Sequence, residues 1–230
     1  MQKNYPMIGL LMATMLEAKP FVKELSLRKY EQKPFEIYGN EKLLLIISGI
    51  GKTNAAAACA YLILKKNPSC ICNLGAAGAM GEEHALGNIY HISKVTEPDR
   101  PELKSGMPHE HMPDTLLTPL VPPQGISQIS PAGDVAFPTA ILATQDRPMK
   151  NPEERKAIAQ TAHLADMEGA AVVQTCRRFH TKCCLFKFVS DTPVEHSIVS
   201  NIRLHRDDFC AFFCKSALPA LLSANQIFSS

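Results

Sequence analysis

The feature that most constrains the fold of this chain is the regular alternation of short apolar runs with helix-like stretches. Runs typical of strands lie at 7–13, 35–38, 43–47, 70–74, 88–95, 140–144 and 185–190. Helical patterns lie between and after them, at 17–25, 52–65, 153–162, 168–179 and from about 207 to 224. Strands that alternate with helices predict an α/β fold with a mostly parallel sheet and helices on both faces. A chain of 230 residues is long enough for one such domain and short for two.

The connections between these runs differ in character. Gly39-Asn40 lies between two strand-like runs and predicts a hairpin turn. The small residues 75–78 follow the run 70–74 and are expected to form a turn. Residues 97–134 hold many Pro, Gly and His and little periodicity, which indicates a long loop or excursion.

The overall charge and apolar content exclude several classes of protein. The net charge is +2, so no basic excess argues for nucleic acid or for an anionic membrane surface. No apolar run approaches the roughly 18 residues that a membrane span needs. The apolar run near the N-terminus faintly mimics a signal peptide, but it is broken by Thr14 and has no convincing cleavage site, so we interpret it as the first strand.

Eight cysteines are present, and their spacings do not match a CxxC zinc site. Several of them alternate within strand-like runs or begin one. We therefore expect buried free thiols that act as small hydrophobes in a reducing cytoplasm.

Acidic residues stand at the ends of predicted strands and at helix starts: Glu17, Asp146, Glu168 and Asp191. A single acid in such a place is usually a helix cap or a surface residue. The set is more informative, because the carboxyl ends of parallel strands converge on one edge of a sheet. Asp166 and Glu168 also lie in a run of small and apolar residues, where an unpaired carboxylate would be costly.

Three further motifs are weak. Gly49-Ile50-Gly51-Lys52 resembles a phosphate-binding loop but lacks the spacing of a P-loop. "NLGAAG" is not a dinucleotide-binding fingerprint, and its small residues favour close approach of a ligand or another backbone. His109-Glu110-His111 could hold a metal, but no third ligand is identifiable, so we expect no metal and no cofactor.

Four stretches taken together resemble the purine nucleoside phosphorylase/nucleosidase superfamily: "SGIGKTNAAAA" at 48–58, "NLGAAGAM…GNI" at 73–89, "DMEGAAVVQTC" at 166–176 and "FVSD" at 188–191. They are most similar to its hydrolytic branch, which includes methylthioadenosine/S-adenosylhomocysteine nucleosidases and futalosine hydrolases. The resemblance covers nearly the whole chain outside 97–140. It implies a single domain over 1–230, with a central mixed twisted sheet flanked by helices.

The resemblance also implies a sugar-binding side of the site. Glu168 resembles the acid that accepts hydrogen bonds from the ribose hydroxyls, and Met167 would lie beside the sugar. Ala76 falls where the family has small residues near the sugar and the nucleophile. Ile50, in the loop before the helix 52–65, is expected to contact the substrate. Asp166, one position out of phase with Glu168, is expected to cap the helix start.

The chemical groups follow by the same resemblance. Asp191 resembles the general acid at purine N7, and Ser190 helps to hold the base. Glu17 falls where the nucleosidases carry the acid that orients the attacking water. Breaking a C–N glycosidic bond builds positive charge on the sugar and negative charge on the purine, so a proton donor and a water-steering carboxylate both help. Asp191 must keep its proton near neutral pH, so we expect a water-poor pocket.

Hydrolysis is favoured over phosphorolysis, because the chain lacks the N-terminal Gly-Asp-Pro-x-Arg that phosphorylases use for phosphate, and Asn73 stands where they tend to carry arginine. The stretches "TEPDRPELKSGMPHEHMPDTL" and "TQDRPMKNPEER" depart from the usual thioalkyl and adenine pockets, and Arg206 lies near the former. The leaving base therefore stays open. The alternatives are a futalosine hydrolase, a purine nucleoside phosphorylase, or a catalytically silent nucleoside-binding protein. The expected partner is a small purine nucleoside, with no nucleic acid or membrane partner, in a cytoplasmic homodimer.

Overall fold

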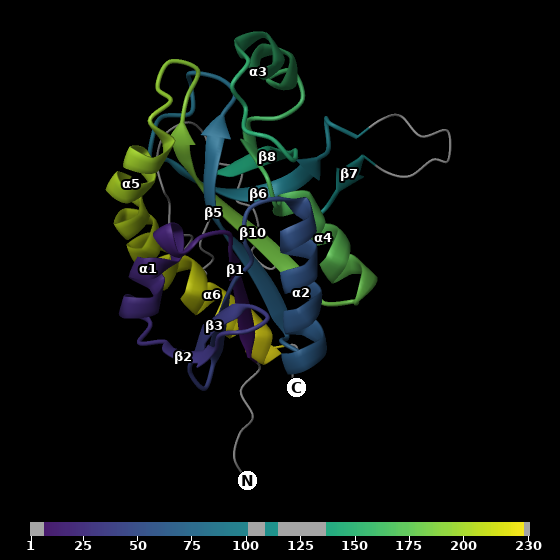
Figure 1. Cartoon of the computed structure of the whole chain (residues 1–230), viewed down its shortest axis with the longest axis vertical. Helices are drawn as coiled ribbons and strands as arrows, with labels where there is room; N and C mark the ends of the chain where they lie inside the picture. The colour runs from purple at the N-terminus through teal and green to yellow at the C-terminus, as the bar shows by residue number, and fades with distance from the viewer. Residues whose placement is uncertain (1–6, 101–108, 115–136, 228–230) are drawn as a thin grey trace.

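A mixed sheet forms the centre of the computed structural model, which describes residues 7–100, 109–114 and 137–227 (Figure 1). Within these residues the sheet has ten strands. Their bounds are β1 Ile8–Met12, β2 Arg28–Glu31, β3 Glu36–Gly39, β4 Leu43–Ile47, β5 Cys70–Ala79, β6 Ile89–Thr96, β7 Glu110–His111, β8 Thr139–Thr144, β9 Leu164–Asp166 and β10 Lys182–Asp191.

The strand pairings bring several carboxyl ends to one edge. The order along the sheet is β10-β6-β8-β9-β5-β1-β4-β3-β2, and β10 also pairs with β5, which closes five strands into a circuit. β1 runs parallel to β4 and β5, and β5 runs parallel to β10. Chain segments that leave the ends of β1, β5 and β10 therefore start close together, which is where parallel sheets form their sites.

Helices cover both faces of the sheet: α1 Met15–Glu24, α2 Lys52–Lys66, α3 Pro152–Ile158, α4 Gly169–Arg178, α5 Ile198–Phe212 and α6 Leu218–Ile227, with a π-helical turn at Phe213–Ala217. Figure 1 shows α2 and α4 on one face and α1, α5 and α6 on the other, with α3 beyond one end of the sheet. The expected fold class, a mixed sheet flanked by helices, is confirmed.

The two helical layers pack differently against the sheet. On the α1/α5 face, Phe21 lies against Phe209 and Phe213, with ring centroids 5.6 and 5.7 Å apart. On the other face α2 contributes small buried side chains, such as Ala55 and Ala58, to the core that α4 shares. Small side chains let α2 lie close to the strands. The loop before α2 leaves the end of β4, and because β4 and β5 both run parallel to β1, this loop starts at the same edge where β5 ends.

Several boundaries differ from the prediction. The stretch 75–78 is not a turn, because β5 continues through it in register with β10, where Gly75 pairs with Lys187 and Gly78 with Asp191. The helix expected at 153–162 ends at Ile158, and the one expected at 207–224 begins at Ile198. β2 has a polar sequence typical of an edge strand, and β9 has three residues, so neither shows an apolar run.

Two other expectations concern loops. The hairpin is confirmed, because β3 and β4 pair antiparallel and the Asn40 N–H donates to the carbonyl of Leu43. Most of the excursion expected at 97–134 lies outside the described residues. Within the described part, β7 pairs with the end of β6.

Candidate active site

Glu17 lies in the first turn of α1, directly after β1, and is 5% exposed. One carboxylate oxygen accepts hydrogen bonds from the backbone N and the hydroxyl of Thr14, at 3.1 and 2.6 Å, which forms a capping box. The other oxygen accepts the backbone N–H of Ala76, on β5, at 2.9 Å. Glu17 therefore ties the start of α1 to the end of β5.

Glu168 precedes the first residue of α4 and is also buried. Its Oε1 accepts the backbone N–H of Gly51 at 2.9 Å, so it bridges to the loop before α2. Burial raises the pKa of Glu168 to about 7, and the neighbouring charge of Asp166 acts in the same direction. Lys187 and the Gly51 hydrogen bond oppose this rise. Near neutral pH, this carboxyl group is therefore close to its titration midpoint.

Lys187 is a buried cation among these acids. It is 1% exposed, and its Nζ lies 2.8 Å from Oδ2 of Asp166. Burial lowers the pKa of Lys187, but the charges of Asp166, Glu168 and Glu17 outweigh that effect and the net pKa is raised. Lys187 therefore stays charged and partly neutralises the acids.

Asp166 caps the start of α4, as the sequence predicted. Its Oδ2 accepts the N–H of Gly169 at 2.9 Å, and its Oδ1 accepts the hydroxyl of Thr144 at 2.6 Å. Together with the ion pair to Lys187, these contacts explain why an acid at 166 can lie in the interior. Both carboxylate oxygens of Asp166 have partners within the chain, so its burial is explained without a ligand.

Asp191, the last residue of β10, is 5% exposed. Its Oδ1 accepts the hydroxyl of Ser190 at 2.9 Å, and its Oδ2 lies 2.7 Å from Nη2 of Arg155, on α3. The side chain of Asn201 donates to the carbonyl of Ser190 at 2.9 Å. The carboxyl group thus lies in a water-poor place, but it forms an ion pair there.

Two glycines of β5 make room for these carboxylates. A Cβ at Gly75 would lie 2.9 Å from Oε1 of Glu17, and one at Gly78 would lie 2.7 Å from Oδ2 of Asp191. A side chain at either position would displace the acid that it faces. The small residues of "NLGAAG" therefore allow the close approach of two carboxylate side chains, where the sequence predicted the approach of a ligand or another backbone, and they belong to a strand.

The remaining predicted site residues lie around these groups. Ala76 and Met167 are half-buried, beside the contacts of Glu17 and Glu168 respectively. Ile50 is 54% exposed, in the loop whose Gly51 binds Glu168. Arg206 donates to the carbonyl of Leu16, at the start of α1, at 2.7 Å.

The loop 49–52 resembles an anion-binding loop, but the amides of Gly49, Gly51 and Lys52 already have partners within the chain. The N–H of Gly51 donates to Glu168, and that of Lys52 donates to Asp146 at 2.8 Å. Gly49 and Gly51 have φ of 84° and 101°, which favour glycine. A helix N-terminus attracts anions, and here two carboxylates of the chain itself take that place.

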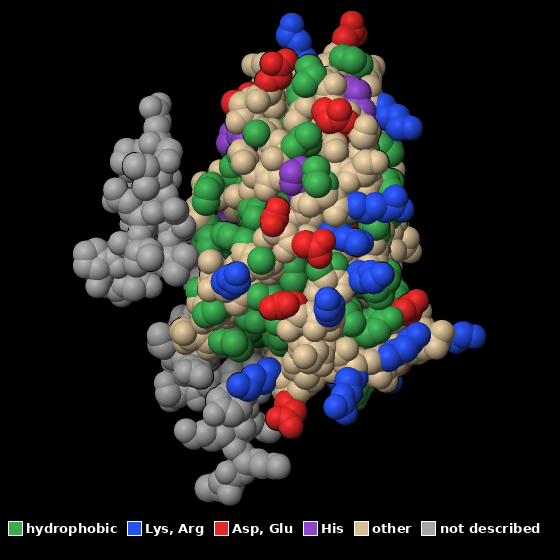
Figure 2. Space-filling model, turned by 90° about the vertical axis from the view of Figure 1, so that its left-hand side faces the viewer, with side chains coloured by type: hydrophobic (Ala, Val, Ile, Leu, Met, Phe, Trp, Pro, Cys, Tyr) green, Lys and Arg blue, Asp and Glu red, His purple; other side chains and the backbone are tan. Residues whose placement is uncertain are grey.

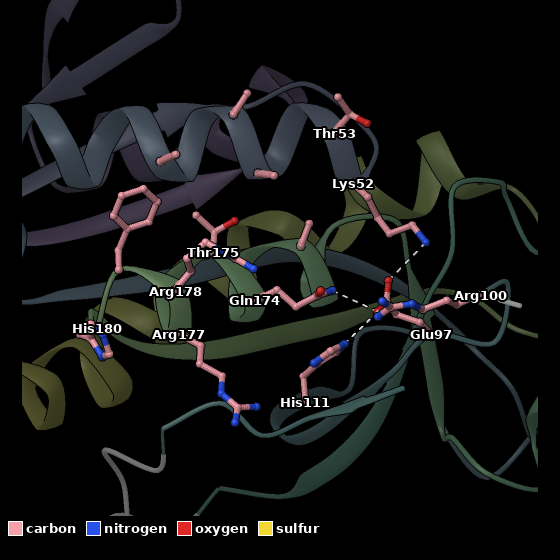
Figure 3. A pocket seen from close by; sticks show the side chains of 15 residues that line it. Lys52, Thr53, Glu97, Arg100, His111, Gln174, Thr175, Arg177, Arg178 and His180 are labelled. Carbon is pink, nitrogen blue, oxygen red and sulfur yellow. Dashed lines mark hydrogen bonds and ion pairs between the residues drawn. The ribbon is translucent and has the colours of Figure 1, made fainter. Parts of the chain in front are cut away.

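A second polar cluster surrounds Glu97, beside the first turn of α2 (Figure 3). Glu97 accepts hydrogen bonds from His111, Gln174 and Arg100 at 2.8, 3.0 and 3.2 Å. Burial raises its pKa, but the His111 hydrogen bond and nearby cations outweigh that, so the net pKa is lowered. His111, considered above as a metal ligand, thus binds a carboxylate.

This cluster borders a cavity of about 930 Å³ between α2 and α4. The cavity is lined by Ala56, Ala57, Ala60 and Ala171 and by polar side chains that include those in Figure 3. Lys52 reaches over it toward Glu97, with Nζ 3.5 Å from Oε1, and donates to Asp99 at 2.8 Å. This cavity, called the groove below, therefore has small apolar side chains along its floor and the charged cluster of Lys52, Glu97 and Asp99 at one end.

Two residues beside the acids were not predicted as functional. Lys187 had a signal, because a lone lysine interrupts the apolar run "LFKFV". Arg155 had none, because "NPEERKAI" reads as an ordinary polar helix. Its role depends on α3 lying over the end of β10, which no local pattern reveals.

Other features bear on the excluded classes. Basic and acidic side chains are interspersed on the face that Figure 2 shows. In the described part of the chain, no helix is both long and apolar enough to cross a membrane. Nor does any group of three or more His, Cys, Asp or Glu side chains among the described residues have an arrangement that could hold a metal ion. All eight cysteines are free, and seven are buried, as predicted.

The fold and these groups define a class. Residues 7–216 match the sequence profile of the phosphorylase superfamily, and the chain belongs to that superfamily.

Among its relatives, the chain is 30% identical over 163 residues to the 5'-methylthioadenosine/S-adenosylhomocysteine nucleosidase of Shewanella sediminis, covering 66% of this chain and 69% of that protein. The nucleosidase of Staphylococcus aureus is 27% identical, covering 67% and 71%. The structure of futalosine hydrolase from Helicobacter pylori superposes with a TM-score of 0.78 at 15% identity, covering 95% of this chain and 98% of that one. The methylthioadenosine/S-adenosylhomocysteine nucleosidase of Neisseria meningitidis gives 0.70 at 20%, covering 98% and 100%.

Proposed function

We propose that this protein hydrolyses the N-glycosidic bond of a purine nucleoside of the methylthioadenosine or S-adenosylhomocysteine kind, and releases the free base and a ribose derivative. The observation that carries this proposal is the set of buried acids at one sheet edge. Glu17 binds the backbone at Ala76, and Asp191 pairs with Gly78 two residues further along β5. Glu168 reaches the same region through its interaction with Lys187.

In this proposal each acid has its own role. Glu17 holds and orients the attacking water, and the start of α1 keeps its carboxylate in place. Glu168 accepts hydrogen bonds from the ribose hydroxyls, with Met167, Ala76 and Ile50 around the sugar. A carboxylate beside the sugar also stabilises the positive charge of an oxocarbenium-like transition state.

Asp191 supplies the proton to purine N7, and Ser190 orients it through the bond at 2.9 Å. Protonation turns the purine into a better leaving group. The poor departure of the unprotonated base is the main barrier to breaking a C–N glycosidic bond.

Hydrolysis is favoured over phosphorolysis by the charges beside the acids. Phosphorolysis requires cations that are free to bind phosphate. Lys187 lies among the acids but is already paired with Asp166. The amides of Gly51 and Lys52 are occupied by Glu168 and Asp146.

Futalosine is the alternative substrate, because futalosine hydrolase and methylthioadenosine/S-adenosylhomocysteine nucleosidase both have the fold of this chain. The substrate is found by incubating the purified protein with methylthioadenosine, S-adenosylhomocysteine, futalosine and inosine, with and without phosphate, and measuring free base. We expect release without phosphate. Release only with phosphate would make the protein a phosphorylase, and tight binding without any release would make it a silent binder.

The Asp191→Asn substitution separates proton donation from binding. We expect kcat to fall by about 10²–10⁴-fold, because the amide cannot supply the proton, while the Kd of the nucleoside changes by less than about fivefold. Steady-state kinetics and calorimetric titration measure the two effects. A kcat near the wild-type value would remove Asp191 from the mechanism.

We further propose that the groove between α2 and α4 is the interface of a homodimer. Ala56 and Ala60 lie one helical turn apart along it, and Leu64, one turn further on, is 71% exposed. Small side chains let a partner helix approach closely, and an exposed leucine gains free energy when it is covered. The family resemblance supports the same assembly.

The cysteines support a cytoplasmic location as part of this proposal. Cys72 and Cys184 have sulfurs 3.3 Å apart, and those of Cys59 and Cys176 are 3.5 Å apart, yet both pairs are unbonded. Thiols so close together persist most readily in a reducing compartment.

A further inference from the structure

Arg155 contacts the end of the site through three chain segments. Its Nη1 donates to the carbonyl of Ala79, at the end of β5. Its Nη2 donates to the carbonyl of Met149 at 2.8 Å and to Oδ2 of Asp191 at 2.7 Å. Arg155 is 3% exposed, so these contacts take the place of water around the guanidinium.

This arrangement fixes both partners of the ion pair. The two carbonyls hold the guanidinium, and the planar guanidinium then holds the carboxylate in one orientation. The hydroxyl of Ser190 binds the other carboxylate oxygen, at 2.9 Å. Asp191 consequently has a hydrogen-bond donor on each carboxylate oxygen, so the orientation of its carboxyl group is fixed from both sides.

An acid that donates a proton to a leaving group needs that proton in the reacting complex. We propose that Arg155 is the positioning residue of Asp191: it aims the carboxyl group along the end of β5 and sets the pH above which Asp191 no longer donates. This inference rests on the proposed function for its catalytic consequence, but the ion pair can be tested without it.

Other charged groups near Asp191 act in the same region. A cavity of about 300 Å³ beside Arg155 is lined by Lys150, Lys156, His196 and Glu82. Among the charged side chains that line this cavity, Arg155 is in direct contact with the carboxylate of Asp191. A change in the proton affinity of Asp191 on removing Arg155 therefore reports on that contact.

The test uses Arg155→Met and Arg155→Lys, with Arg147→Gln as the matched control. Arg147 lies in the same segment but points to solvent, where it pairs with Glu154. With the charge removed, the carboxylate loses its stabilising partner and Asp191 keeps its proton to higher pH. We expect the alkaline limb of the kcat profile to move up by about one pH unit or more in Arg155→Met. We also expect kcat at neutral pH to fall about tenfold or more, with KM changed by less than about threefold.

Arg155→Lys keeps the charge but not the paired geometry, so its alkaline limb should lie near that of the wild type while kcat stays reduced. Arg147→Gln should match the wild type in both. Unchanged kcat and an unchanged profile in both Arg155 variants, with the wild type active, would overturn the inference and leave the proposed function standing.

A direct titration keeps the inference testable even if no nucleoside is cleaved. The carboxyl carbon signal of Asp191, in protein labelled with ¹³C-aspartate and assigned with Asp191→Asn, is followed against pH. We expect its midpoint to move to higher pH by about one unit or more in Arg155→Met, or in Arg155→Gln if the first variant does not fold. No movement of the midpoint would overturn the inference, whereas a wild type that releases no base would overturn only the proposed function.

Discussion

At the scale of single residues, the partners of each buried acid distinguish its chemistry more than its residue type or its depth does. Glu17, Glu168 and Asp191 are similar acids at similar depth, but their partners differ. Glu17 is held by N–H and O–H donors, Asp191 by a guanidinium, and Glu168 by one amide beside another acid. Burial and the like charge of Asp166 raise the pKa of Glu168 to about 7.

This pKa predicts how stability depends on pH. A glutamate in the unfolded chain has a pKa of about 4.3, so between about pH 4.5 and 7 the folded state binds more protons at Glu168 than the unfolded state does. The free energy of unfolding should therefore fall as pH rises through this window, by up to about 3 kcal/mol from this group. Glu168→Gln lacks that titration.

The measurement is urea unfolding of both proteins at about pH 5 and about pH 8. We expect the wild type to lose more stability than Glu168→Gln between these two conditions. Because the other ionisable groups are common to both proteins, the difference isolates Glu168. Equal losses would mean that the raised pKa belongs to another group.

At the scale of elements, the end of β5 organises the site. The strand contributes no charged side chain there; it contributes backbone amides, small side chains and room for the carboxylates. Ala76 offers its N–H to Glu17, and Gly75 and Gly78 leave room for carboxylates. A strand of small residues thus places two acids from distant parts of the chain against one backbone.

Gly78→Ala tests this use of space. The added Cβ would lie 2.7 Å from Oδ2 of Asp191, so the carboxyl group must move. We expect kcat to fall at least about tenfold, because displacement by even about 1 Å misaligns a catalytic group. Gly39→Ala is the control, since its Cβ would meet Leu44 at 2.5 Å in the remote hairpin. That variant should lose stability but keep its kcat; loss of kcat in both alike would indicate a general effect of strand distortion.

At the scale of the whole molecule, the two helical layers have different tasks. The α1/α5 layer builds an aromatic core around Phe21, Phe209 and Phe213. The α2/α4 layer is built from small residues and leaves a groove of about 930 Å³ on its surface. The groove adjoins the loop that binds Glu168, so a partner covering it would also stabilise that side of the site.

The Leu64→Glu substitution tests the proposed dimer, and Leu204→Glu is the matched control. Both leucines are exposed on helices, by 71% and 68%, but Leu204 lies on α5. We expect the wild type and Leu204→Glu to sediment as dimers, and Leu64→Glu to dissociate at least about tenfold more readily, because a charge would be buried at the interface. A monomeric wild type would refute the dimer, and dissociation of Leu204→Glu alone would place the interface on the other face.

The alternation of the longer strands with helices, the hairpin at Gly39-Asn40 and the acids at strand ends could be predicted from the sequence by itself, whereas the strands β2, β7 and β9 could not. These features depend on local periodicity, turn chemistry and motif, which neighbouring residues specify. Asp166 as a helix cap is of the same kind, because its partner Gly169 lies three residues away.

The tertiary structure alone decided the rest. The strand through 75–78 exists because β10 lies beside it in register, and the small residues gave no sign of that partner. Lys187 is charged in the interior because Asp166 and Glu168 come near it from one chain segment and Glu17 from another. Arg155 reaches Asp191 across 36 positions of the chain. Contacts of this kind depend on how the layers pack, since the energy of a buried charge is set by its neighbours in space and not by its neighbours in sequence.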